Sequence, residues 1–196
     1  LMDEPLSNLD ARLRLKIREE IRSLVKEVGI TTLFVTHDQE EALSIGDKII
    51  LFNEGVIQQD DLGQNFYLEP NNYFVANFVG NPVIDNFKVK MQDGKLIGSD
   101  FELNVNDLQQ ARFKCQLTDG DYILSVRPEN ILPSNDGNVS AHIDDVELIG
   151  RERILKFTHD GVQARSLVDL ETPIKAGDDI KLEMRLDRVF IFTPEG

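Results

Sequence analysis

Two carboxylates and one imidazole stand where short hydrophobic segments of the chain end. Asp3 and Glu4 are adjacent near the start, and His37 follows the β-branched segment 31–36. Neighbouring residues of a strand point to opposite faces, so we expect the two carboxylates to do different work. One can hold the water shell of Mg²⁺ while the other faces an attacking water. Together with an imidazole at a neighbouring strand end, they are the parts that phosphoryl transfer requires around a Mg-nucleotide.

A helix is expected directly after these carboxylates. Ser7 and Asp10 have the spacing of a capping box, which satisfies free N–H groups at a helix start. Apolar residues then recur every three or four positions until Gly29, a typical helix stop. The apolar face that they predict is made by Leu13, Ile17, Ile21, Leu24 and Val28. The charged side chains on the opposite face, such as Arg22, are interpreted as solvent-exposed.

The rest of the first 80 residues alternates between strand and helix signals. Segment 31–36 predicts a buried strand, and 39–45 predicts a helix. Segments 49–52 and 56–59 predict a hairpin around a turn at 53–55, followed by two short helices near 62–68 and 71–78. This order is typical of a parallel α/β sheet, in which ligands bind at the carboxyl ends of the strands.

The pattern changes near 80–82, after which short strands and glycine-containing turns dominate. The expected strands cover 122–126, 139–148, 153–158, 163–168, 180–184 and 189–192. Several short strands with regular turns indicate a small β-barrel or sandwich. We therefore expect two domains, 1–80 and 81–196.

Composition excludes several classes of protein. The 35 acidic and 21 basic residues give a net charge of −14, which argues against binding nucleic acid through bulk charge. No segment approaches the roughly 20 apolar residues of a membrane span, and no signal peptide is visible. A single cysteine excludes a disulfide framework and favours a reducing compartment.

The chemistry-bearing residues resemble those of the ATP-binding subunits of ABC transporters. Segment 1–4 matches the end of the Walker B strand, and His37 matches the switch histidine. The resemblance implies that Asp3 serves Mg²⁺ through its water shell and that Glu4 is the general base that polarises the hydrolytic water. It also implies that His37 contacts the γ-phosphate.

The turn after the carboxylates carries the same resemblance. Ser7-Asn8-Leu9-Asp10 is similar to the D-loop, which in the family lies across a dimer interface and helps to complete the partner's ATP site. Segments 38–42 and 74–80 are similar to importer ATPases of the maltose and multiple-sugar type. Segment 126–131 resembles the Arg-Pro-Glu segment of that family's regulatory domain, an OB-like barrel called TOBE.

The resemblance defines a fold and a function as expectations. Residues 1–80 would be the C-terminal part of a P-loop (RecA-like) nucleotide-binding domain with a parallel sheet, and 81–196 an OB-like regulatory β-barrel. The cofactors would be ATP and Mg²⁺, and the partners a second subunit in a homodimer and transmembrane permease subunits. Such a subunit is cytoplasmic and peripheral on the inner face of the membrane, without membrane insertion or nucleic acid.

The P-loop pattern G-x-x-x-x-G-K-[ST] is missing from these 196 residues. Gly94-Lys95 is the one Gly-Lys pair, and Val89 stands where the first glycine should be. The Q-loop and the Leu-Ser-Gly-Gly-Gln signature are missing too. We therefore expect this chain alone to be inactive as an ATPase, and its sheet to have an exposed edge that favours disorder near the start or self-association.

Two classes of function stay open at this point. The first is a portion of an ATPase subunit that energises import of a sugar, with polyamine, iron or oxyanion as alternative solutes. The second is a non-enzymatic regulatory and dimerisation module.

Overall fold

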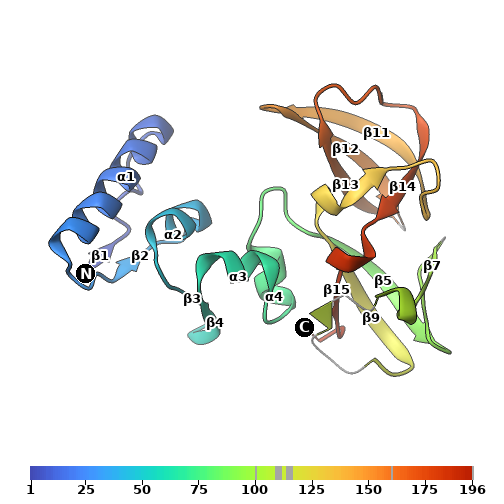
Figure 1. Cartoon of the computed structure of the whole chain (residues 1–196), viewed down its shortest axis with the longest axis horizontal. Coiled ribbons are helices and arrows are strands. Elements are labelled where there is room, and N and C mark those ends of the chain that lie inside the picture. Colours follow the sequence, from blue (N-terminus) through green and yellow to red (C-terminus); the bar gives the residue numbers. More distant parts are fainter. Residues whose placement is uncertain (100, 109–111, 114–116, 160, 196) are drawn as a thin grey trace. The chain divides into compact units, whose positions relative to one another are not determined.

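The structure is a computed structural model that describes all residues except 100, 109–111, 114–116, 160 and 196. The chain divides into two compact units, unit 1 (Leu1–Val79) and unit 2 (Gly80–Gly196), and Figure 1 labels most of their helices and strands. Among the described residues, no helix has the length and apolar character needed to cross a bilayer.

Unit 1 contains two strand pairs and four helices. Their bounds are β1 Met2–Asp3, α1 Ala11–Val28, β2 Phe34–Val35, α2 Gln39–Ile45, β3 Ile49–Asn53, β4 Val56–Asp61, α3 Gly63–Leu68 and α4 Tyr73–Phe78. Strands β1 and β2 pair in parallel, with Met2 opposite Phe34 and Asp3 opposite Val35. The predicted hairpin is confirmed, since β3 and β4 are antiparallel. The parallel pair brings the ends of β1 and β2 to the same edge, and this pairing positions the site.

Helix α1 begins later than the capping-box interpretation implies. Asp10 is its N-cap and accepts a hydrogen bond from Leu13 N at 2.9 Å, whereas the Ser7 hydroxyl donates to the Glu4 carbonyl at 3.0 Å. The capping-box assignment of Ser7 is therefore wrong, because a turn over residues 4–7 uses that hydroxyl. The predicted stop at Gly29 is confirmed: this residue adopts φ 68°, a left-handed conformation that suits glycine.

The faces of α1 agree with the sequence expectation in part: the expected solvated charges are exposed at Arg12, Lys16, Glu19, Glu20 and Lys26. Leu24 and Val28 of the predicted apolar face are 55% and 53% exposed. On the opposite face, Arg22 donates to the Ser44 and Ile45 carbonyls at 2.9 and 2.8 Å. The prediction that Arg22 is solvated is wrong, because the last carbonyls of α2 lack donors within their own helix and take them from this guanidinium.

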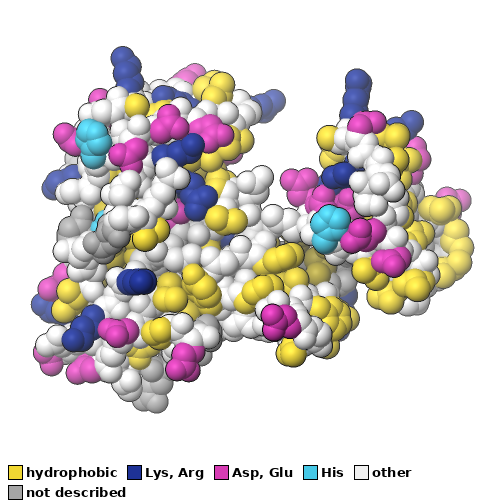
Figure 2. All heavy atoms as spheres, turned by 180° about the vertical axis from the view of Figure 1, so that it is seen from behind, with side chains coloured by type: hydrophobic (Ala, Val, Ile, Leu, Met, Phe, Trp, Pro, Cys, Tyr) yellow, Lys and Arg dark blue, Asp and Glu magenta, His cyan; other side chains and the backbone are white. Residues whose placement is uncertain are grey.

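Unit 1 exposes many other apolar side chains. Figure 2 shows hydrophobic atoms at the surface on the face that it presents. Large exposed hydrophobic residues of unit 1 include Leu1, Leu15, Ile30, Leu33, Phe52, Val56, Ile57 and Leu62. The uncovered apolar surface expected from the sequence is thus present. Self-association through it stays a prediction.

Unit 2 is built from two sheets with one shared core. The six-stranded sheet has the order β7-β6-β5-β9-β15-β8 and the five-stranded sheet the order β10-β14-β11-β12-β13. The strands of the first are β5 Asp85–Gln92, β6 Lys95–Ile97, β7 Glu102–Asn104, β8 Arg112–Phe113, β9 Gly120–Val126 and β15 Phe190–Phe192. Those of the second are β10 Ile131–Pro133, β11 Val139–Ile149, β12 Glu152–His159, β13 Val162–Asp169 and β14 Asp179–Met184. Three 3₁₀ turns complete the described part: η1 Val105–Leu108, η2 Pro128–Asn130 and η3 Leu186–Arg188.

The six strands expected from the sequence are all present, with ends shifted by a few residues. Apolar side chains of both sheets, including Leu124, Phe157 and Leu182, form one buried cluster. The edge strands β10 and β13 of the five-stranded sheet are joined where the Ser166 hydroxyl donates to the Ile131 carbonyl. This closure is the barrel-like feature of unit 2.

The turn before β11 brings Gly137 against the backbone of β14. A Cβ added at Gly137 would lie 2.5 Å from the Leu182 carbonyl carbon and oxygen, and main-chain atoms inside a sheet cannot move aside cheaply. We expect Gly137→Ala to destabilise unit 2 by about 1–3 kcal/mol, the usual cost of overpacking. Urea denaturation measures this loss, with Asp136→Ala in the same turn as an exposed control. Equal stability of the two variants would contradict the close approach.

Candidate functional site

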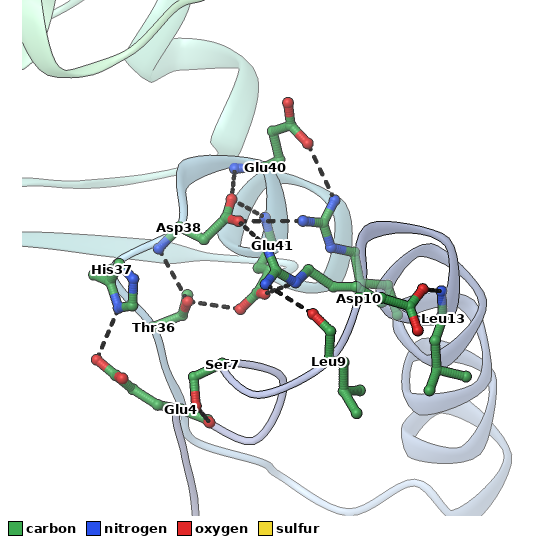
Figure 3. A network of polar contacts seen from close by, with 12 residues as sticks. Glu4, Ser7, Leu9, Asp10, Leu13, Thr36, His37, Asp38, Glu40 and Glu41 are labelled. Carbon is green, nitrogen blue, oxygen red and sulfur yellow. Dashed lines mark hydrogen bonds and ion pairs between the residues drawn. The ribbon is translucent and has the colours of Figure 1, made fainter.

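Glu4 and His37 meet at the edge where β1 and β2 end. His37 Nδ1 lies 2.9 Å from Glu4 Oε1, as the dashed line in Figure 3 shows. Parallel pairing explains this contact, because each residue stands one or two positions beyond its strand and both strands run to the same edge. The two side chains remain accessible, with 46% of the Glu4 and 76% of the His37 side chain exposed. A carboxylate and an imidazole are thus placed where a ligand can reach both.

The backbone of Glu4 is held in an uncommon conformation. Its φ of 42° lies in the left-handed region, which costs a residue other than glycine about 1–3 kcal/mol. Two contacts stabilise it: Glu4 N donates to the Val35 carbonyl at 2.9 Å, and the Ser7 hydroxyl donates to the Glu4 carbonyl at 3.0 Å. Left-handed residues held in this way are frequent at functional sites. Here the conformation sets the direction in which Glu4 leaves the strand.

The other residues expected at the site take different places. Asp3 ends β1 with an exposed side chain, and Asn8 is exposed in the turn that follows. Ser7 supports Glu4, and Asp10 caps α1. The structure therefore brings Ser7 and His37 directly to Glu4, whereas Asp10 serves the helix start.

Asp3 is the residue that the sequence predicts to hold Mg²⁺ at this edge. Among the described residues, no group of three or more potential ligand side chains surrounds a common point. Mg²⁺ usually keeps several waters and takes one or two carboxylates together with substrate phosphates. A single exposed carboxylate beside Glu4 fits that mode of binding.

Sequence reasoning missed a polar network behind the Glu4–His37 pair. Arg14 and Arg18 of α1 reach the Asp38 carboxylate at 3.5 and 3.4 Å. The Thr36 hydroxyl donates to Glu41 Oε2 at 2.7 Å, and Glu41 is only 3% exposed. Figure 3 shows this network between the turn at 4–10 and the start of α2. A small polar pocket opens into it, lined by Glu4, Ser7, Arg14, Thr36, His37, Asp38 and Glu41.

A signal for the network is present in the sequence. Arg14, Arg18 and Arg22 are spaced four residues apart, which places all three on one face of a helix. Arg14 and Arg18 pair with acidic groups at the N-terminus of α2, and Arg22 binds carbonyls at its C-terminus. A stripe of one charge along a helix could have indicated a docking face rather than a solvated one.

The Glu4 contact predicts how His37 titrates. The hydrogen bond from His37 to Glu4 and the negative charge of Glu4 raise the pKa of His37 above its ordinary value of 6.5. The contact therefore stabilises the fold fully below pH 6.5, and this contribution is lost as the pH rises through the raised pKa. NMR titration of the histidine ring should show the raised pKa, and Glu4→Gln should lower it. An unchanged His37 pKa in Glu4→Gln would contradict the contact.

Similarity to known proteins extends along the whole chain. The ABC transporter ATP-binding protein YurJ of Bacillus subtilis (strain 168), described as uncharacterized, is 36% identical across 100% of this chain and 56% of its own length. The trehalose/maltose import ATP-binding protein MalK of Thermococcus litoralis is 34% identical across 98% of this chain and 54% of its own. Residues 124–192 match the family model of the TOBE domain. The chain is thus similar to ABC transporter ATP-binding proteins along its whole length. It spans about half the length of these curated relatives.

The residues that match the TOBE domain model lie in unit 2, where they run from β9 to β15. Among solved structures, the molybdate-bound cytoplasmic protein ModG covers 56% of this chain and 96% of its own at 13% identity and a TM-score of 0.44. A likeness with this TM-score supports no conclusion about the function of this chain.

Proposed function

We propose that unit 1 supplies the general base and the γ-phosphate contact for ATP hydrolysis in an ABC importer. The observation that carries this proposal is the 2.9 Å contact between Glu4 and His37 at the end of the parallel pair β1–β2. Homology to ATP-binding subunits supports the choice of ATP as the nucleotide.

The roles of the two residues follow from their chemistry. Glu4 orients the attacking water and accepts its proton, since an ionised carboxylate only accepts hydrogen bonds. His37 is held through Nδ1, and in the protonated ring, which the raised pKa of His37 favours, Nε2–H can donate to an oxygen of the transferred phosphoryl group. Mg²⁺, held by Asp3 through water, would neutralise charge on the phosphates. The left-handed backbone conformation of Glu4 keeps its carboxylate at the end of β1.

Other parts of the proposed site lie outside these 196 residues. Without P-loop amide groups and lysine, nothing cradles the β- and γ-phosphates, so the proposed activity belongs to a longer polypeptide that contains them. Ser7, Asn8 and Asp10 would form the D-loop at the interface of a homodimer. Residues 1–80 would then be the C-terminal part of a RecA-like domain, of which β1 and β2 are two parallel strands.

The transported solute is proposed from a relative alone. MalK of Thermococcus litoralis is named for trehalose and maltose import, which supports a sugar. Polyamine, iron and oxyanion are the alternatives. Permease subunits are the proposed membrane partners, and the inner face of the membrane is the proposed location.

A regulatory role is proposed for the barrel. Unit 2 is compact with its own buried core and contains the match to the TOBE domain. Binding of an effector or a protein partner there is the second candidate function, and it requires no catalysis by this chain.

The test is phosphate release from ATP in two samples. A complete subunit containing these residues and a P-loop should hydrolyse ATP with Mg²⁺, whereas the 196-residue chain should show no turnover. Steady, Glu4-dependent turnover by the 196-residue chain would contradict the need for a P-loop. No turnover by the complete subunit would contradict the proposed enzyme and leave the regulatory role.

A further inference from the structure

Both neighbours of His37 in the chain are held by side-chain contacts. The Thr36 hydroxyl accepts a hydrogen bond from Asp38 N at 3.0 Å and donates to Glu41 Oε2 at 2.7 Å. The Asp38 carboxylate accepts from Glu40 N at 2.8 Å and from Glu41 N at 3.2 Å, which caps α2. The Thr36 hydroxyl therefore links the two ends of the loop that carries His37, as the dashed lines in Figure 3 show.

Burying the Glu41 carboxylate costs free energy, and the need to cap α2 does not explain why Glu41 is buried here. Its side chain is 4% exposed, and a buried carboxylate is unfavourable unless it is paired and hydrogen-bonded. Asp38 already provides the N-cap of α2, so the helix start does not need Glu41. What Glu41 adds is the bond to Thr36 and an ion pair with Arg14, whose Nε lies 3.6 Å from Glu41 Oε1.

Arg14 links this loop to the turn on the other side of the pocket. Its Nη2 donates to the Leu9 carbonyl at 3.2 Å, and its Nη1 lies 3.5 Å from the Asp38 carboxylate. One guanidinium thus touches the turn that carries Ser7 and the loop that carries His37. Because Ser7 supports Glu4, both members of the catalytic pair are connected to Arg14.

We propose that Glu41 and Arg14 are positioning residues that hold His37 toward Glu4 through the Thr36 hydroxyl. The contacts of Arg14 with Glu41, Asp38 and the Leu9 carbonyl form a bridge between the His37 loop and the turn over residues 6–10. We expect the loop and the turn to move together. The catalytic meaning of this bridge rests on the proposed function. The placement of His37 itself does not, and it can be measured in the 196-residue chain without nucleotide.

The readout is the protonated nitrogen of the neutral His37 ring. Glu4 as a carboxylate can only accept, so the contact requires the proton on Nδ1. Long-range ¹⁵N–¹H spectra of the histidine rings distinguish the Nδ1–H from the Nε2–H form. In the unmodified chain at a pH where the ring is neutral, we expect His37 to be mainly the Nδ1–H form. A merely structural role of the network would not move this signature.

Thr36 offers a matched pair of variants. Thr36→Val keeps the shape and removes the hydroxyl, whereas Thr36→Ser keeps the hydroxyl. We expect Thr36→Val to lose most of the Nδ1–H form and Thr36→Ser to retain it. An unchanged signal in Thr36→Val would overturn the proposal, and so would equal loss in both variants, because the hydroxyl would then not be the cause.

Glu41→Gln and Arg14→Gln test the same proposal, and this test does not depend on whether Thr36→Val folds. Both should reduce the Nδ1–H form of His37, while Lys16→Gln, on an exposed side chain of the same helix, should leave it unchanged. Retention of the full signal in Glu41→Gln and Arg14→Gln would overturn the proposal. In the complete subunit, Glu41→Gln should lower kcat with little change in KM. Absence of ATPase activity in the unmodified subunit would defeat the proposed function, while the ring spectra would still decide the positioning.

Discussion

Glu4→Gln in the complete subunit is expected to lower the rate of ATP hydrolysis by about 10²–10⁴-fold, the usual contribution of a positioned general base. Glutamine has nearly the same shape but cannot accept the proton of the attacking water. Nucleotide binding should persist, because Glu4 faces the water rather than the phosphates in the proposed site. Phosphate release under saturating ATP, with equilibrium binding of a fluorescent nucleotide, measures both quantities.

Glu20→Gln is the matched control for this prediction. Glu20 lies on α1 with 58% of its side chain exposed and pairs with Lys16 at 3.8 Å, a weak surface contact. Its rate should equal that of the unmodified subunit. A Glu4→Gln rate within a few-fold of the control would remove Glu4 from the role of base.

Arg165→Leu is expected to destabilise unit 2 by about 3–5 kcal/mol at pH 8, because it leaves a buried carboxylate without its counter-charge. Arg165 of β13 binds Asp85 of β5 through Nη2 at 2.8 Å, Nε at 3.1 Å and its backbone N at 2.9 Å. Asp85 is 3% exposed, and the pair joins the two sheets of unit 2. Urea denaturation followed by NMR signals of unit 2 measures the loss.

The pH dependence of this variant identifies the cause. Burial raises the pKa of Asp85 from 3.8 to about 6, although Arg165 opposes the shift. The folded state then holds the proton more tightly than the unfolded state, so this group lowers stability as the pH rises from 3.8 to about 6. Without Arg165 the pKa rises further, and the variant should lose less stability at pH 5 than at pH 8. Arg185→Leu, at a 47% exposed side chain, is the control, and equal losses of Arg165→Leu at both pH values would contradict this origin.

The strand and helix pattern of unit 1 could be predicted because its signals are local. Periodic apolar residues, Gly29 and the turn at 53–55 each mark an element within a few positions. The meeting of Glu4 and His37 followed from one further rule, that parallel strands end at the same edge. Both side chains stand just beyond such ends, and the structure places them 2.9 Å apart.

The arginine network could not be predicted from hydrophobic periodicity, because that pattern describes only apolar faces. It predicted an apolar face that includes Leu24 and Val28, and both of these are exposed. The stripe of α1 that carries Arg18 and Arg22 docks on α2, since the ends of α2 present groups that these two side chains can satisfy. The Asp85–Arg165 pair could not be predicted from the sequence for another reason. Its members are 80 residues apart, and only the folding of two sheets brings them together.

The joint action of Glu4 and His37 is tested most directly by a double-mutant cycle. The measurement is single-turnover phosphate release by the complete subunit carrying Glu4→Gln, His37→Ala or both. Residues that act as a unit on one reacting centre are strongly non-additive, so the double variant should be about as slow as the slower single variant. If the two losses instead multiply, Glu4 and His37 act independently, and the account of a catalytic pair at the end of β1 and β2 is wrong.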